Sequence, residues 1–177
     1  MLVENLRRLG IEKLDYIMIS HSHSDHIYGV TDEKGVLANI PVGEVLISGV
    51  YNGGLDNPYL VDDLCKEKGI PVRTLKKGDV LELGEATLLK AGIQEIEKLD
   101  VDLLKIPHHG HNTSSSVSFV MAVKPEIAVA MGYCNMSSAV RNAYLMSSTD
   151  VVTDRNNGYV HIYTDGQTMM KDVQRAE

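Results

Sequence analysis

The sequence predicts a layered α/β domain, and three of its features support that class. Short apolar runs that suit buried strands alternate with stretches of helical spacing along most of the chain. Glycine, proline and asparagine mark the ends of these segments. The composition, 44% hydrophobic and 23% charged over 177 residues, is that of an ordinary globular protein. A chain of this length can bury its own core, so we expect a single domain over residues 1–177.

Helices are predicted where helical spacing lies between residues that start or stop a helix. Asn57-Pro58 supplies an N-cap and a proline at the first helical position, and Gly69 follows the last residue of that segment. Gly10 and Pro125 end two other segments in the same way. On these signals, helices are expected over residues 2–9, 30–39, 57–68, 94–99, 116–123 and 138–146.

Strands are predicted at short apolar runs between turn signals. The run at residues 16–19 is continuous rather than alternating, which indicates a strand covered on both faces. Asn157-Gly158 and Asp165-Gly166 bracket another apolar run and predict a closing antiparallel hairpin. Strands are expected over residues 16–19, 44–47, 72–75, 80–83, 87–89, 103–106, 127–131, 151–153 and 159–164.

The composition argues against several classes of protein. A formal net charge of −7, from 24 acidic and 17 basic residues, disfavours strong non-specific binding to nucleic acid. Cys65 and Cys134 are too few for a disulfide framework or a zinc knuckle. The sequence contains neither a membrane-length apolar run nor a signal-peptide pattern. We therefore expect a cytoplasmic protein with no membrane segment in this chain.

The densest polar motif follows the strand expected at residues 16–19. His21, His23, Asp25 and His26 lie within six residues, and imidazole and carboxylate are ligands of zinc, iron and manganese. At positions i and i+2 of an extended chain, His21 and His23 point to one side and can hold one ion together. Asp25 and His26 either bind a second ion or complete the ligands of the first. The alternative is a polar loop that is rich in histidine.

A second polar motif, residues 107–116, follows the strand expected at residues 103–106. It contains His108, His109 and His111, and ends in a run of serines. Two strands that both end in histidines can bring those ends together at one edge of a sheet. The serines suit the start of the next helix, but that interpretation leaves Pro107-His108-His109-Gly110 unexplained.

These two motifs resemble those of the metallo-β-lactamase superfamily, and within it the hydrolase domain of ComEC-type DNA-uptake proteins. Leu14-Asp15-Tyr16 leading into the first motif, and Asp102 leading through the strand into His108-His109-Gly110, carry the resemblance. It implies a metallo-β-lactamase-like αβ/βα sandwich. It also implies that the fold is incomplete at the N-terminus, because members of the family usually have strands before the first helix. An internal strand pair is expected to be missing as well, because the interval between Gly84 and Leu103 contains no Gly-Asp pair to bridge two metals.

The resemblance also implies roles for individual residues. By analogy the metal ligands are His21 and His23 for a first ion, and Asp25, His26 and His108 for a second. Asp25 would also orient the attacking water, and His109 would sit in the outer shell or touch the substrate. The cofactor would be zinc or manganese, as one or two ions. Because three protein ligands and a water make up a usual catalytic zinc site, the second position is favoured if a single ion binds.

Two functions from different classes fit these features. The first is a metal-dependent hydrolase, phosphodiesterase-like or nuclease-like, that uses a metal-bound hydroxide on a small-molecule or nucleic-acid phosphodiester. The second is a degenerate, non-catalytic member of the fold that acts as a binding or regulatory module, which the missing carboxylate favours. Strand edges left free by the missing strands would also promote a homodimer.

Overall fold

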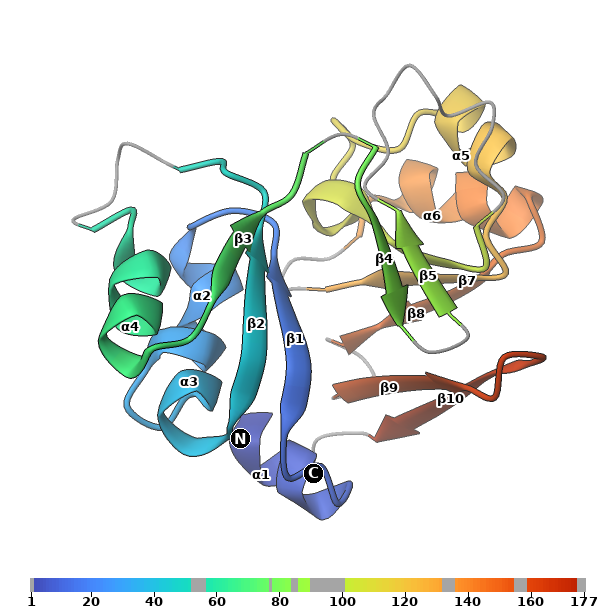
Figure 1. The fold of residues 1–177 in the computed structure, drawn as a ribbon. Helices are drawn as coiled ribbons and strands as arrows, with labels where there is room; N and C mark the ends of the chain where they lie inside the picture. Colours follow the sequence, from blue (N-terminus) through green and yellow to red (C-terminus); the bar gives the residue numbers. More distant parts are fainter. Residues whose placement is uncertain are drawn as a thin grey trace. The chain divides into compact units, whose positions relative to one another are not determined.

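The computed structural model describes residues 2–51, 57–76, 78–83, 86–89, 101–131, 136–154 and 159–174. The chain divides into two compact units, Met1–Lys76 and Lys77–Glu177 (Figure 1). Both units contain helices and a parallel three-stranded sheet, which confirms the predicted α/β class. The expected helix at residues 94–99 lies outside the described residues.

The first unit is built on a parallel sheet in the order β1 (Leu14–Ile19), β2 (Val42–Ile47), β3 (Val72–Thr74). Its helices are α1 (Leu2–Arg8), α2 (Ser24–Thr31), α3 (Val36–Asn39) and α4 (Leu60–Lys68). Ile19 pairs with Ile47, and Ile47 pairs with Thr74, so the three strands end in register. The first histidine motif therefore leaves the sheet at its carboxyl edge, where open α/β sheets usually carry their ligands.

Helices α2, α3 and α4 pack against one face of this sheet (Figure 1). The core cluster joins β1 and β2 to these three helices through Ile19, Ile27, Leu37, Val45, Ile47, Val61 and Cys65. The alternate residues of β1 are exposed, Tyr16 by 38% and Met18 by 56%. The first unit therefore covers only one face of β1, whereas the sequence predicted a strand covered on both faces.

The second unit contains a parallel sheet in the order β6 (Leu103–Lys105), β7 (Ile127–Ala130), β8 (Asp150–Thr153). Helices α5 (Val117–Val123) and α6 (Ser138–Met146) pack on it through a core that includes Ile106, Val120, Ala128, Val140 and Tyr144. Two antiparallel pairs accompany it: β4 (Val80–Leu83) with β5 (Ala86–Leu89), and β9 (Tyr159–Thr164) with β10 (Met169–Gln174). The closing hairpin is thus confirmed.

One predicted helix differs in a way that matters for the site. We expected a helix from about residue 30 to Asn39, but α2 already begins at Ser24, and α3 follows after a break. Gly29 lies inside α2, where a Cβ would stand 3.2 Å from Leu2 on α1. The Asp32 carboxylate accepts the backbone N–H of Lys34 at 2.9 Å, and this turn separates the two helices. Asp25 and His26 consequently lie on the first turn of a helix.

Within the part of the chain that the structure describes, every helix is too short or too polar to span a bilayer.

Candidate metal centre

The first histidine motif is fixed at both of its ends. The backbone N–H of Ser48, just after β2, donates to the carbonyl of Ile19 at 3.2 Å, and the Ser48 hydroxyl donates to the carbonyl of Ser20. At the other end His23 is the N-cap residue of α2, and its carbonyl accepts the N–H of His26 at 2.9 Å. Within the motif, Ser22 is only 5% exposed. The backbone that carries the ligand candidates is therefore held by the sheet edge and by the helix start.

His21 and His23 present ring nitrogens to each other. His21 Nε2 lies 3.0 Å from His23 Nδ1, and the two rings meet edge to face with centroids 4.8 Å apart. Two nitrogens bound to one tetrahedral zinc at about 2.0–2.1 Å would be separated by about 3.3 Å. The separation in the pair is thus close to that of two ligands of one ion.

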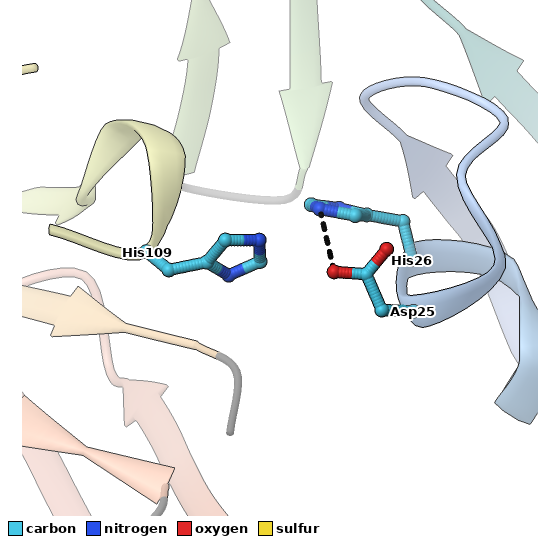
Figure 2. A group of neighbouring side chains, drawn as sticks. All are labelled: Asp25, His26 and His109. Carbon is cyan, nitrogen blue, oxygen red and sulfur yellow. Dashed lines mark ion pairs between the residues drawn. The ribbon is translucent and has the colours of Figure 1, made fainter. Parts of the chain in front are cut away.

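Asp25 and His26 form a second pair, on the first turn of α2. Asp25 Oδ2 lies 3.7 Å from His26 Nε2, and Figure 2 marks this ion pair with a dashed line. Consecutive residues of a helix do not normally face each other, so helix geometry alone does not produce this approach. The His26 side chain is 12% exposed and the Asp25 side chain 36%, so the carboxylate is partly accessible to solvent.

The two pairs meet through His21. Its ring lies against that of His26, with centroids 3.9 Å apart. Ser20, which is not among the residues predicted from the sequence, places its hydroxyl 3.0 Å from His21 Nδ1 and 3.3 Å from His26 Nδ1. The only sequence signal for Ser20 is its position directly before the motif. The first unit therefore brings together four of the predicted site residues, His21, His23, Asp25 and His26.

The second histidine motif has an unusual backbone. Pro107–Gly110 forms a short 3-10 turn, η2, in which His108 (φ 48°) and His109 (φ 53°) both adopt the left-handed conformation, followed by Gly110 (φ 77°). Each non-glycine residue in this region costs about 1–2 kcal/mol. Such strain persists only where the surroundings enforce it, and it concentrates at functional sites.

Hydrogen bonds and packing hold the turn that contains His108 and His109 in this conformation. The N–H of His111 donates to the His108 carbonyl at 2.8 Å, and the N–H of Ser137 donates to the Gly110 carbonyl at 2.9 Å. Ser114 donates its hydroxyl to the carbonyl of Pro107 at 2.8 Å. A Cβ on Gly110 would lie 2.5 Å from Cγ of Met136. The turn is therefore packed tightly against the start of α6.

The ring of His109 has a defined orientation. Its Nδ1 donates to the backbone carbonyl of Met131, just after β7. A carbonyl can only accept, so in the neutral ring the proton is on Nδ1 and Nε2 keeps its lone pair. His108 places Nδ1 2.9 Å from the Thr113 hydroxyl, which also lies 3.4 Å from His111 Nδ1. His109 is drawn with Asp25 and His26 in Figure 2 and belongs to the second unit.

Comparison with known proteins identifies the family. A family model described as "Metallo-beta-lactamase superfamily" matches residues 2–125. The chain belongs to this superfamily. The matched region includes both histidine motifs, and it confirms the resemblance on which the metallo-β-lactamase-like fold was predicted.

Three curated relatives are similar to this chain. Competence protein ComA of Neisseria gonorrhoeae is 31% identical over an alignment of 186 positions, which covers 87% of this chain and 24% of that protein. ComE operon protein 3 of Bacillus subtilis is 23% identical, over 72% of this chain and 21% of its own length. A UPF0173 protein of Pyrococcus abyssi is 29% identical, over 70% of this chain and 68% of its own length. The chain thus spans less than a quarter of the length of ComA and of ComE operon protein 3.

Proposed function

We propose that this chain is a metal-dependent hydrolase that cleaves a phosphodiester or a related ester. The observation that carries the proposal is the pairing of ligand atoms in the first motif, where His21 faces His23 and Asp25 faces His26. Both pairs have separations close to those of two ligands on one ion. Membership of the metallo-β-lactamase superfamily supports it.

The donor set suits zinc or manganese. Imidazole nitrogens and one carboxylate are ligands for both metals, while a site with no thiolate disfavours softer ions. In this proposal His21 and His23 would hold a first ion, and Asp25, His26 and His108 a second. The second position has three protein ligands, the usual number at a catalytic zinc, so it would be the better occupied of the two.

When bound, the metal would lower the pKa of a coordinated water and neutralise charge on the attacked ester. The remaining roles belong to the chain. Asp25 is 36% exposed and would use its second carboxylate oxygen to orient the attacking water. His109 donates Nδ1–H to the Met131 carbonyl, so it would lie beside the substrate with a lone pair on Nε2 and accept there the proton that the attacking water gives up.

The proposal is tested by hydrolysis of bis-p-nitrophenyl phosphate by purified protein supplied with zinc or manganese. We expect metal-dependent turnover that falls by about 100-fold or more in Asp25→Asn, because loss of the carboxylate that orients the attacking water would misplace the nucleophile. Lys13→Ala, in an exposed ion pair with Asp15 on β1, is a matched control that should keep its activity. Absence of turnover by folded, metal-loaded protein would overturn the proposal.

A second candidate function is a binding module without catalysis. The sequence favours it at one point, because no Gly-Asp pair occurs between Gly84 and Leu103 to supply a bridging carboxylate. A module of this kind would bind zinc and a phosphodiester such as thymidine dinucleotide without cleaving either the dinucleotide or the nitrophenyl ester. Binding without turnover would therefore select this second candidate over the first.

A further inference from the structure

We propose that the Ser20 hydroxyl is a positioning group shared by the two metal positions. It accepts Nδ1–H from both His21 and His26, and it thereby keeps the Nε2 atoms of both rings unprotonated and able to bind metal. This inference rests on the proposed metal centre and adds a residue to it. The contacts that carry it are the distances of 3.0 Å to His21 Nδ1 and 3.3 Å to His26 Nδ1.

Proton counting limits how these contacts can be made. A serine hydroxyl has one proton and two lone pairs, whereas a neutral imidazole has one N–H and one lone pair. Ser20 can therefore donate to at most one of the two rings, and the other ring must donate from Nδ1. In the arrangement that prepares both rings for metal, both donate, and the two lone pairs of Ser20 are filled. The tautomer of each histidine is then set by a single oxygen atom.

Two further contacts of the rings agree with this arrangement. His21 Nε2 is the atom that faces His23 Nδ1, and His26 Nε2 is the atom that faces Asp25 Oδ2. The nitrogen that points away from the ligand pair is Nδ1 in both rings, and in both it points at Ser20. Ligating histidines commonly donate their other ring N–H to an oxygen, which orients the ring and increases its basicity as a ligand.

Ser20 is itself held in place by the sheet. It follows Ile19, the last residue of β1, which is 5% exposed, and its carbonyl accepts the hydroxyl of Ser48. The Ser48 oxygen in turn accepts the N–H of Val50 at 3.1 Å. The backbone of Ser20 is therefore held by the aligned ends of β1 and β2, and a group that orients others needs such a fixed backbone.

If one hydroxyl supports both metal positions, its removal should lower zinc affinity at both. His21 is proposed for the first ion and His26 for the second, so removal of one oxygen should weaken zinc binding at both positions. Loss of such a supporting group typically lowers metal affinity by about 10–100-fold. Because Ser20 is exposed and water can replace part of the contact, we expect about 10-fold at each position.

The experiment compares Ser20→Ala and Ser20→Thr with the wild type. Ser24→Ala is the matched control, since it makes the same chemical change in an exposed serine of the same motif. Zinc affinity is measured by competition with a chromogenic chelator. The imidazole tautomers of the metal-free proteins are measured by long-range ¹H–¹⁵N NMR, with circular dichroism to establish that each variant is folded. The NMR reading does not depend on metal or on activity.

We expect the wild type, Ser20→Thr and Ser24→Ala to carry the proton of His21 and His26 on Nδ1 and to bind zinc alike. Ser20→Ala should shift both rings towards the Nε2–H tautomer and lose affinity for both ions. Unchanged tautomers and affinity in folded Ser20→Ala would overturn the inference while leaving the metal centre intact. A wild type that binds no zinc would instead overturn the proposed function.

Discussion

Replacement of Gly110 by alanine should destabilise the turn that carries His108 and His109, for two separable reasons. The first is the backbone, because Gly110 has φ +77° and a non-glycine residue there costs about 1–2 kcal/mol. The second is space, because the new Cβ would stand 2.5 Å from Cγ and 3.2 Å from Cβ of Met136. Overpacking of this kind costs about 1–3 kcal/mol, so Gly110→Ala should lose about 3 kcal/mol in total.

Two further variants separate these contributions. Gly78 lies in the same unit with φ +86°, and a Cβ at this position would have nothing within 4 Å, so Gly78→Ala should cost only the backbone part, about 1 kcal/mol. In a Met136→Ala background the cost of Gly110→Ala should fall towards that value, because the 2.5 Å contact with Cγ is gone and only the 3.2 Å contact with Cβ remains. The free energy of unfolding is measured by urea titration followed by circular dichroism, and the double-mutant cycle gives the coupling.

The reasoning would be refuted if Gly110→Ala and Gly78→Ala cost the same, since the contact with Met136 would then have no energetic effect. It would equally be refuted if the penalty of Gly110→Ala persisted unchanged in the Met136→Ala background.

Three other predictions concern single groups. The Cys65 thiol is fully buried, and burial raises its pKa. In a variant that lacks the other cysteine, Cys65 should therefore react with Ellman's reagent only as fast as the protein unfolds. Rapid reaction of the native protein would contradict its place in the core. Tyr144→Phe, which removes the hydroxyl that donates to Ser115 at 3.1 Å, should cost about 1 kcal/mol in urea titration, and a cost of zero would show that this contact adds nothing. A hydrogen bond from the backbone N–H of Thr168 is the chief cause that lowers the pKa of Asp165 from its ordinary 3.8. The difference in free energy of unfolding between wild type and Asp165→Asn should therefore be full above pH 3.8 and shrink as the pH falls below it. A difference that does not change with pH would refute this.

The α/β class and most elements could be predicted from the sequence because their signals are local. Helix α4 ends at Lys68 as predicted, and Gly69 takes the left-handed conformation (φ 67°) that a helix stop uses. Helix α6 spans Ser138–Met146, as its apolar spacing indicated. The early start of α2 at Ser24 could not be predicted in this way, because the N-cap residue His23 makes no side-chain capping bond and the motif has the composition of a polar loop.

In the candidate site, too, some features could be predicted from the sequence and others could not. The proximity of His21 to His23 could be predicted, since positions i and i+2 of an extended chain share a side. The left-handed backbone of His108 and His109 could not, because side chains other than glycine avoid that region and only tertiary contacts enforce it. The role of Ser20 depends on ring orientation, which spacing does not encode. The single-domain organisation, the cytoplasmic location and self-association through strand edges stay predictions.

Metal content tests most directly our proposal that His108 binds a metal ion together with Asp25 and His26. Zinc-loaded protein is freed of excess metal and analysed for zinc per chain, alongside His108→Ala and His111→Ala. We predict about one tightly held ion in the wild type, since three protein ligands and a water suffice for zinc, and retention of that ion in His111→Ala. In His108→Ala the zinc content should fall well below that of the wild type. Equal zinc content in folded His108→Ala and wild type would contradict the account.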